Sequence, residues 1–73
     1  RLLPNPVEDR INVLSDKSID AIVILAADGR EVMRRSVRSS TATVDVSALK
    51  AGAYVLLGWT IEGTLARERF IKH

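Results

Sequence analysis

The chain has 73 residues and a mass of 8.0 kDa, 47% of them hydrophobic and 27% charged, so it is one small folded domain with a thin core. It has no cysteine, and its single histidine is His73, which excludes disulfides, thiolate metal sites and a Ser-His-Asp triad. The net charge of +2 and only three aromatic residues argue against a nucleic-acid-binding protein.

The ends of the chain bear on its origin. The longest apolar run covers residues 21–27 and is too short to cross a bilayer, and the first residues show no signal peptide. The chain begins with Arg1 rather than Met. We therefore interpret residues 1–73 as a single domain taken from a larger protein.

The secondary-structure signal is that of β-strands. Valine, isoleucine and threonine together supply 18 residues, and β-branched side chains favour strands. No window shows the apolar stripe of an amphipathic helix. Turn-forming residues divide the chain into six predicted strands: 7–14, 19–26, 30–38, 41–46, 53–61 and 64–72.

The first half of the chain predicts an entry segment, a central strand and a hairpin. Pro4 and Pro6 flank Asn5 and favour an extended entry into the first strand. Residues 15–18, Ser-Asp-Lys-Ser, are typical of a turn. Strand 19–26 is apolar on both faces, which predicts a central strand. Asp28-Gly29 then predicts a two-residue hairpin turn.

The second half predicts an edge strand followed by a second hairpin. Strand 30–38 carries four arginines and few apolar residues, as edge strands do, and the next strand begins after a break at residues 39–40. Asp45 is placed to cap the following turn. Strand 53–61 is again apolar on both faces, whereas strand 64–72 does not reveal which face is buried.

Six short strands separated by turns predict an all-β fold, a small immunoglobulin-like antiparallel β-sandwich of six or seven strands. A β-barrel is the structural alternative. Gly52 and Gly63 are expected to be turn glycines at positive φ. The expected core residues are Ile22, Ile24, Val44, Val46, Tyr54 and Leu56.

No arrangement of residues points to catalysis. Glu8 and Asp9 are adjacent, and neighbouring strand residues point to opposite faces. The remaining aspartates lack the spacing of a calcium loop. We expect no catalytic residue, metal or cofactor, and no enzymatic activity. The arginines of strand 30–38 are interpreted as a solvated edge; the alternative is contact with phosphate or carboxylate groups, as on lipopolysaccharide or an acidic protein partner.

The order of these motifs resembles the C-terminal sorting domain of the type IX secretion system of Bacteroidetes-type bacteria. Three blocks carry the resemblance: Pro4-Asn5-Pro6-Val7, the apolar residues 22–25 with Asp28-Gly29-Arg30, and Val44-Asp45-Val46-Ser47-Ala48-Leu49-Lys50-Ala51-Gly52-Ala53-Tyr54-Val55. Gly63 and the terminal Phe70-Ile71-Lys72 complete the pattern. The chain departs from it at Leu3, where the family often has an aromatic residue, and at Leu25-Ala26, where it often has Tyr-Asp.

The resemblance implies a secretion signal rather than a reactive site. Such a domain follows a passenger protein, is recognised by the outer-membrane machinery, and directs the passenger from the periplasm to the cell surface or the extracellular space. In many members a surface sortase removes the domain and attaches the passenger to anionic lipopolysaccharide. The alternative is a non-cleaved immunoglobulin-like accessory or surface-anchoring domain.

The last predicted strand is the candidate recognition surface, because a sorting signal needs a readable edge. If Ile71 packs on a partner or at the sheet margin, Arg67, Arg69 and Lys72 face outward and steer an acidic receptor; the alternative is a solvated basic strand. The full set of proposed recognition residues is Arg67, Arg69, Phe70, Ile71 and Lys72. The proposed structural residues are Pro4, Asn5, Pro6, Asp28, Gly29, Gly52, Tyr54 and Gly63.

Overall fold

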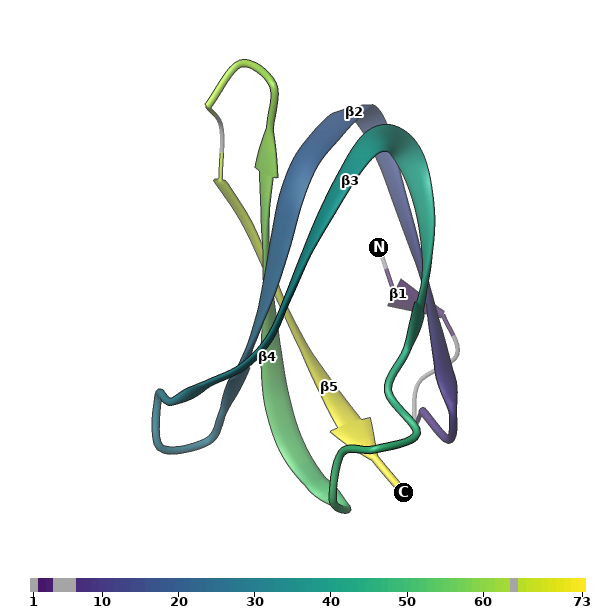
Figure 1. Cartoon of the computed structure of the whole chain (residues 1–73), viewed down its shortest axis with the longest axis vertical. Helices are drawn as coiled ribbons and strands as arrows, with labels where there is room; N and C mark the ends of the chain where they lie inside the picture. Colours follow the sequence, from purple (N-terminus) through teal and green to yellow (C-terminus); the bar gives the residue numbers. More distant parts are fainter. Residues whose placement is uncertain (1, 4–6, 64) are drawn as a thin grey trace.

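A computed structural model describes residues 2–3, 7–63 and 65–73, and its regular structure consists of β-strands that pair antiparallel (Figure 1). This confirms the all-β prediction. The strands are β1 (Leu2–Leu3), β2 (Arg10–Ala26), β3 (Glu31–Asp45), β4 (Gly52–Thr60) and β5 (Leu65–Lys72). They form one sheet in the order β1-β2-β4-β5, with β3 paired to the other edge of β2.

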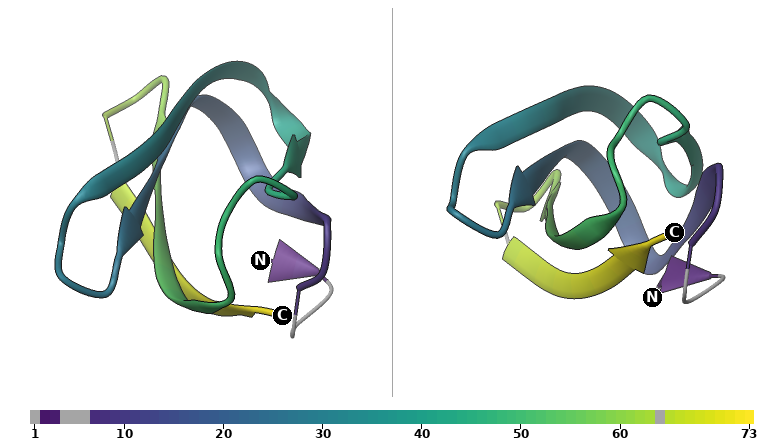
Figure 2. Two further views of the ribbon diagram at one scale, coloured as in Figure 1. Left: turned by 60° about the horizontal axis from the view of Figure 1, so that its bottom comes forward. Right: turned by 90° about the horizontal axis from the view of Figure 1, so that it is seen from below.

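The sheet folds over because β2 and β3 are long and bend together. Figures 1 and 2 show the two strands arching side by side, so that the first half of β2 and the end of β3 stand across from β4 and β5. The pairing of β2 with β3 shifts register between Leu14 and Ile19 and again before Ala21. Such irregularities increase the bend and twist of a strand, and here they bring two halves of one sheet face to face.

This bend corrects the predicted number of strands. Residues 15–18 lie within β2 rather than in a turn, and residues 39–40 lie within β3 rather than in a break. Four of the six predicted strands are therefore halves of two long ones, and the described strands belong to one sheet, so a sandwich of six or seven strands is not confirmed. The polar residues mark the bend, where Arg38 has a φ of 56°.

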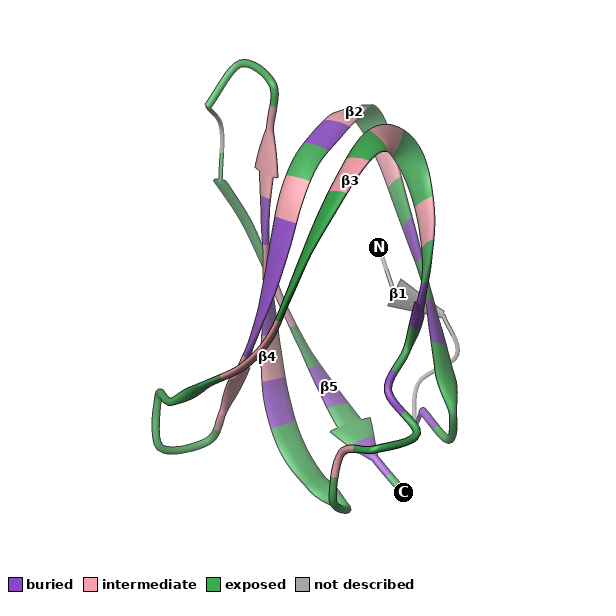
Figure 3. Cartoon of the chain, viewed as in Figure 1, coloured by how far each residue is buried: buried purple, intermediate pink, exposed green. Residues whose placement is uncertain are grey.

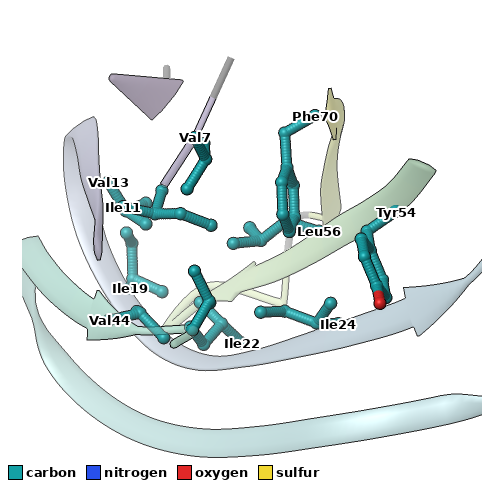
Figure 4. Close-up of a cluster of buried hydrophobic side chains, with 11 residues drawn as sticks. Val7, Ile11, Val13, Ile19, Ile22, Ile24, Val44, Tyr54, Leu56 and Phe70 are labelled. Carbon is teal, nitrogen blue, oxygen red and sulfur yellow. The ribbon is translucent and has the colours of Figure 1, made fainter. Parts of the chain in front are cut away.

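The hydrophobic core lies between the two halves of the folded sheet. Its side chains come from both halves (Figure 4). Buried positions alternate with exposed ones at the start of β2 and the end of β5, and with half-buried ones in β4 (Figure 3). All six predicted core residues are buried. The structure adds Val7, Ile11, Val13, Ile19 and Phe70 to the same cluster.

The hairpin between β2 and β3 confirms the predicted turn but corrects its length. The N–H of Ala26 donates to the carbonyl of Arg30 at 2.8 Å, which leaves three loop residues, 27–29, instead of two. The N–H of Gly29 donates to the carbonyl of Ala26 at 2.9 Å, and Gly29 has a φ of 87°. This is the three-residue loop in which the last position is left-handed, so glycine is favoured there. Among the described strands, β3 pairs with β2 alone, which confirms the predicted edge strand.

Candidate recognition surface on the C-terminal strand

The segment before β4 is held by a turn that begins at Asp45. The Asp45 carboxylate accepts a hydrogen bond from the Ser47 N–H at 2.9 Å, and the N–H of Leu49 donates to the carbonyl of Val46 at 3.0 Å. The predicted cap is therefore confirmed. Hydrogen bonds from the Ser47 side chain and backbone lower the pKa of Asp45, with smaller contributions from Arg10 and Arg35.

Tyr54 connects this turn to the core. Its hydroxyl donates to the carbonyl of Lys50 at 2.6 Å, while its ring stacks on Phe70 with centroids 5.5 Å apart. Gly52, between the two ends of that hydrogen bond, has a φ of 155°, which lies in a region that L side chains rarely adopt. The motif from Asp45 to Tyr54 therefore forms the turn that leads into β4 and packs against Phe70 of β5. Its residues have a structural role.

The contact with Tyr54 decides which face of β5 is buried. Phe70 pairs directly with Tyr54 across the sheet and is 1% exposed. Side chains alternate along a strand, so Lys72 follows Phe70 inward and is only 7% exposed. This corrects the prediction that Lys72 faces outward. Its ammonium group donates to the carbonyl of His73 at 2.8 Å.

The outward face of β5 carries Arg67, Arg69 and Ile71, as predicted for the two arginines. Both arginines are exposed, and Ile71 is 48% exposed. Within the described part of the chain, neither arginine makes an ion pair. Exposed guanidinium groups of this kind can bind carboxylate or phosphate groups of another molecule.

The arginine-rich strand β3 is a weaker candidate. Two nitrogens of Arg34 donate to the Glu31 carboxylate, at 2.8 and 3.2 Å, and this contact lowers the pKa of Glu31. A nitrogen of Arg35 donates to the carbonyl of Arg34 at 2.9 Å. Part of the charge predicted for this edge is therefore compensated within the strand.

The other predicted structural residues divide by position. Pro4, Asn5 and Pro6 lie outside the described residues. The Asp28 carboxylate accepts from the N–H of Arg30 at 3.0 Å, which holds the β2–β3 hairpin. Gly63 has a φ of 86° in the connection between β4 and β5, so its positive φ is confirmed.

The sequence did not reveal what lies beside the outward arginines. Arg67 pairs with Leu57 of β4, and Arg69 pairs with Val55. Leu57 and Val55 are half-buried and lie on the face of the sheet opposite the core. The sequence contains a sign of this apolar surface, because residues 53–61 are apolar on both faces. That pattern by itself predicts only a central strand. The arginines therefore lie at the border of an apolar surface.

The described residues offer little for other chemistry. They contain no group of three or more His, Asp or Glu side chains that could hold a metal ion. They also include no helix that is long and apolar enough to cross a membrane. The features that remain in this part of the chain are the folded sheet, two exposed arginines on β5 and an apolar face beside them.

Comparison with known families identifies the family to which these features belong. Residues 1–72 match the family model described as secretion system C-terminal sorting domain. Searches of curated proteins and of solved structures gave no significant match. The match covers nearly the whole chain, including the motif between Asp45 and Tyr54 and the C-terminal strand. The chain belongs to the family of C-terminal sorting domains of the type IX secretion system.

Proposed function

We propose that this domain carries a passenger protein, joined to its N-terminus, across the outer membrane by presenting the outward face of β5 to the type IX machinery. Membership of the sorting-domain family supports export toward the cell surface or the extracellular space. The observation that carries the choice of surface is the pair Arg67 and Arg69, exposed on one face of β5 and without an ion pair in the described chain.

A folded surface, rather than a linear tag, is favoured by how β5 is held. Phe70 and Lys72 are buried, and β5 pairs with β4 from Leu65 to Lys72. A receptor that read these two side chains would have to unfold the domain. Arg67, Arg69 and Ile71 are accessible without any such change.

After export, a surface sortase removes the domain and attaches the passenger to anionic lipopolysaccharide. This step follows the family and requires no reactive group from the domain, which we propose to be non-enzymatic. A second function, a retained immunoglobulin-like accessory domain that anchors its protein to the surface, predicts that the outward face of β5 does not affect export.

The test is a reporter protein fused to residues 1–73 in a bacterium with a type IX system. Replacing Arg67→Glu and Arg69→Glu together reverses the charge of the outward face without touching the core. We expect surface delivery to fall by at least about tenfold and the reporter to accumulate in the periplasm. The melting temperature of the purified domain should stay within a few degrees of the original.

The matched control is Arg35→Glu with Arg38→Glu, which changes the net charge equally at two exposed sites on β3, a strand separated from β5 by β2 and β4 in the sheet. Export of this variant should be unchanged. Normal export of the Arg67 and Arg69 variant would contradict the proposal. An equal loss in both variants would show that net charge, and not the outward face of β5, governs export.

A further inference from the structure

The face of the sheet opposite the core is apolar across two adjacent strands. Val23 of β2 pairs with Leu57 of β4, and Leu25 pairs with Val55. Val23 lies on the other face of β2 from Ile22, so it does not belong to the core cluster. Its side chain is nevertheless only 2% exposed. An antiparallel sheet usually turns such a face to water and carries polar residues there.

Two rows of side chains cross this outer face and end at the arginines. The first row is Val23, Leu57 and Arg67, and the second is Leu25, Val55 and Arg69. Directly paired residues have Cβ atoms about 4.5–5.5 Å apart, so the Cβ atom of each arginine lies beside an apolar side chain of β4. We call this set of six residues the outer-face patch.

The outer-face patch is hollowed beside the hairpin between β2 and β3. A depression of about 250 Å³ is lined by Leu25, Val55 and Leu57 together with Arg67 and Arg69. Ala26, at the end of β2, and Ala27 and Gly29 of the hairpin complete its lining. Pockets for drug-sized ligands measure about 300–1,000 Å³, so this depression has the size for one large side chain.

The two cations that belong to the outer-face patch both lie on its β5 side. On the β3 side Arg34 is held by Glu31, at 2.8 Å. On the β5 side Arg67 and Arg69 make no ion pair within the described residues. An occupant of the depression therefore meets an apolar floor and two arginines next to it.

We propose that the outer-face patch binds a protein segment in which a large apolar side chain is flanked by carboxylates. The apolar side chain fills the depression over Leu25, Val55 and Leu57, and the carboxylates bind Arg67 and Arg69 through paired N–H groups. This deepens the proposed function, on which it rests, by naming the chemistry of the partner that reads β5.

A second copy of the domain does not fit this site. The six residues of the outer-face patch include no carboxylate, so the same patch of a second copy supplies no acidic partner for Arg67 and Arg69. A phosphate-bearing lipid would satisfy the arginines, but a depression of about 250 Å³ is small for several acyl chains. The shape and the charge together favour an acidic protein segment.

The test uses the whole 73-residue domain and a capped pentapeptide with one phenylalanine between two pairs of glutamates. Trp59, the only tryptophan, pairs with Leu65 beside the patch and reports binding through its fluorescence, with amide chemical shifts as a second readout. We expect saturable binding with shifts concentrated at Leu25, Val55 and Leu57. Peptides with lysines in place of the glutamates, or with alanine at the centre, should bind at least about tenfold more weakly.

Two variants separate the contribution of the apolar lining of the depression from that of the arginines. Leu57→Asn and the pair Arg67→Gln with Arg69→Gln should each weaken peptide binding by about tenfold or more. Ile61→Asn, at a 69% exposed apolar residue away from the patch, should leave it unchanged. Equal affinity of all variants, or binding to phosphatidylglycerol vesicles but not to the peptide, would overturn the proposal.

The two proposals fail in different ways. If the peptide does not bind while the Arg67 and Arg69 reversal still stops export, the outward face of β5 is read by another chemistry and only the acidic-segment inference falls. If the peptide binds but the reversal leaves export normal, the outer-face patch is a real binding site and its role in export falls.

Discussion

The backbone N–H of Val7 donates to the carbonyl of Ile71 at 2.7 Å, so the segment that leads into the sheet holds the segment that ends it. The N–H of His73 returns the contact by donating to the carbonyl of Val7 at 2.8 Å, which makes a parallel bridge between Val7 and Lys72. The side chain of Val7 is fully buried beside Phe70 in the core cluster. The C-terminal residues are therefore part of the fold rather than a free tail.

Deleting residues 70–73 should abolish export because it unfolds the domain. Loss of a buried phenylalanine alone costs about 3–5 kcal/mol, which is a large share of the stability of a domain this small. The deletion also removes the two hydrogen bonds to Val7. Circular dichroism of the purified truncation should show no cooperative melting, and a fused reporter should remain in the periplasm. A truncation that exports its reporter normally would contradict this.

Tyr54→Phe should destabilise the domain without disturbing its surface. The change removes the hydroxyl that donates to Lys50 but keeps the ring stacked on Phe70. We expect a loss of about 1–2 kcal/mol and a melting temperature lower by roughly 4–15 °C. Peptide binding to the outer-face patch, measured well below that temperature, should be unaltered. An unchanged melting temperature would show that the hydrogen bond contributes nothing.

The turn glycines should be needed for backbone shape alone. A Cβ at Gly52 or Gly63 meets no atom within 4 Å, so substitution costs only the strain of a positive φ. Gly52→Val and Gly63→Ala should each lower the free energy of unfolding by about 1–3 kcal/mol. Gly58→Ala is the control, because its Cβ would make an ordinary contact of 3.9 Å with Ile22. A stable Gly52→Val variant that is not exported would mean that the glycine is read directly.

Replacing Asp28-Gly29 with Val-Val should lower stability and export together. The change forces a β-branched residue into a φ of 87° and removes the carboxylate that accepts from Arg30. It leaves β5 unchanged. Thermal melting and surface delivery should be measured in the same variant. Delivery at the original level from an unfolded variant would show that the signal is read as an extended peptide.

Acid should destabilise the domain partly through Asp45. The pKa of Asp45 is lowered from its ordinary value of 3.8 by the hydrogen bonds from Ser47, so its contribution is complete above that value. It is lost as the pH falls through the lower pKa of the folded state. Melting temperatures between about pH 5 and 2 should fall less steeply for Asp45→Asn than for the original chain. Identical slopes would exclude this carboxylate as a source of the pH dependence.

The sequence by itself determined the local features. The β-branched composition, the turn at Asp28-Gly29 and the cap at Asp45 all follow from neighbouring residues. Each can be predicted because a turn or a strand face is specified by side chains within a few positions of one another. The family membership follows from the same local motifs in their order.

Only the tertiary structure decided how these pieces pair. Residues 15–18 have the composition of a turn but remain in β2, because β3 bends with them and keeps the ladder paired on both sides of the bend. The sequence does not indicate which face of β5 is buried. The stacking of Phe70 on Tyr54 places that face inside, and Lys72 lies on the same face. The bridge from Val7 to the last residues joins opposite ends of the chain, so no local pattern records it. Pairings of this kind are determined by the burial of side chains that are distant in sequence. The same pairings place Arg67 and Arg69 beside an apolar face.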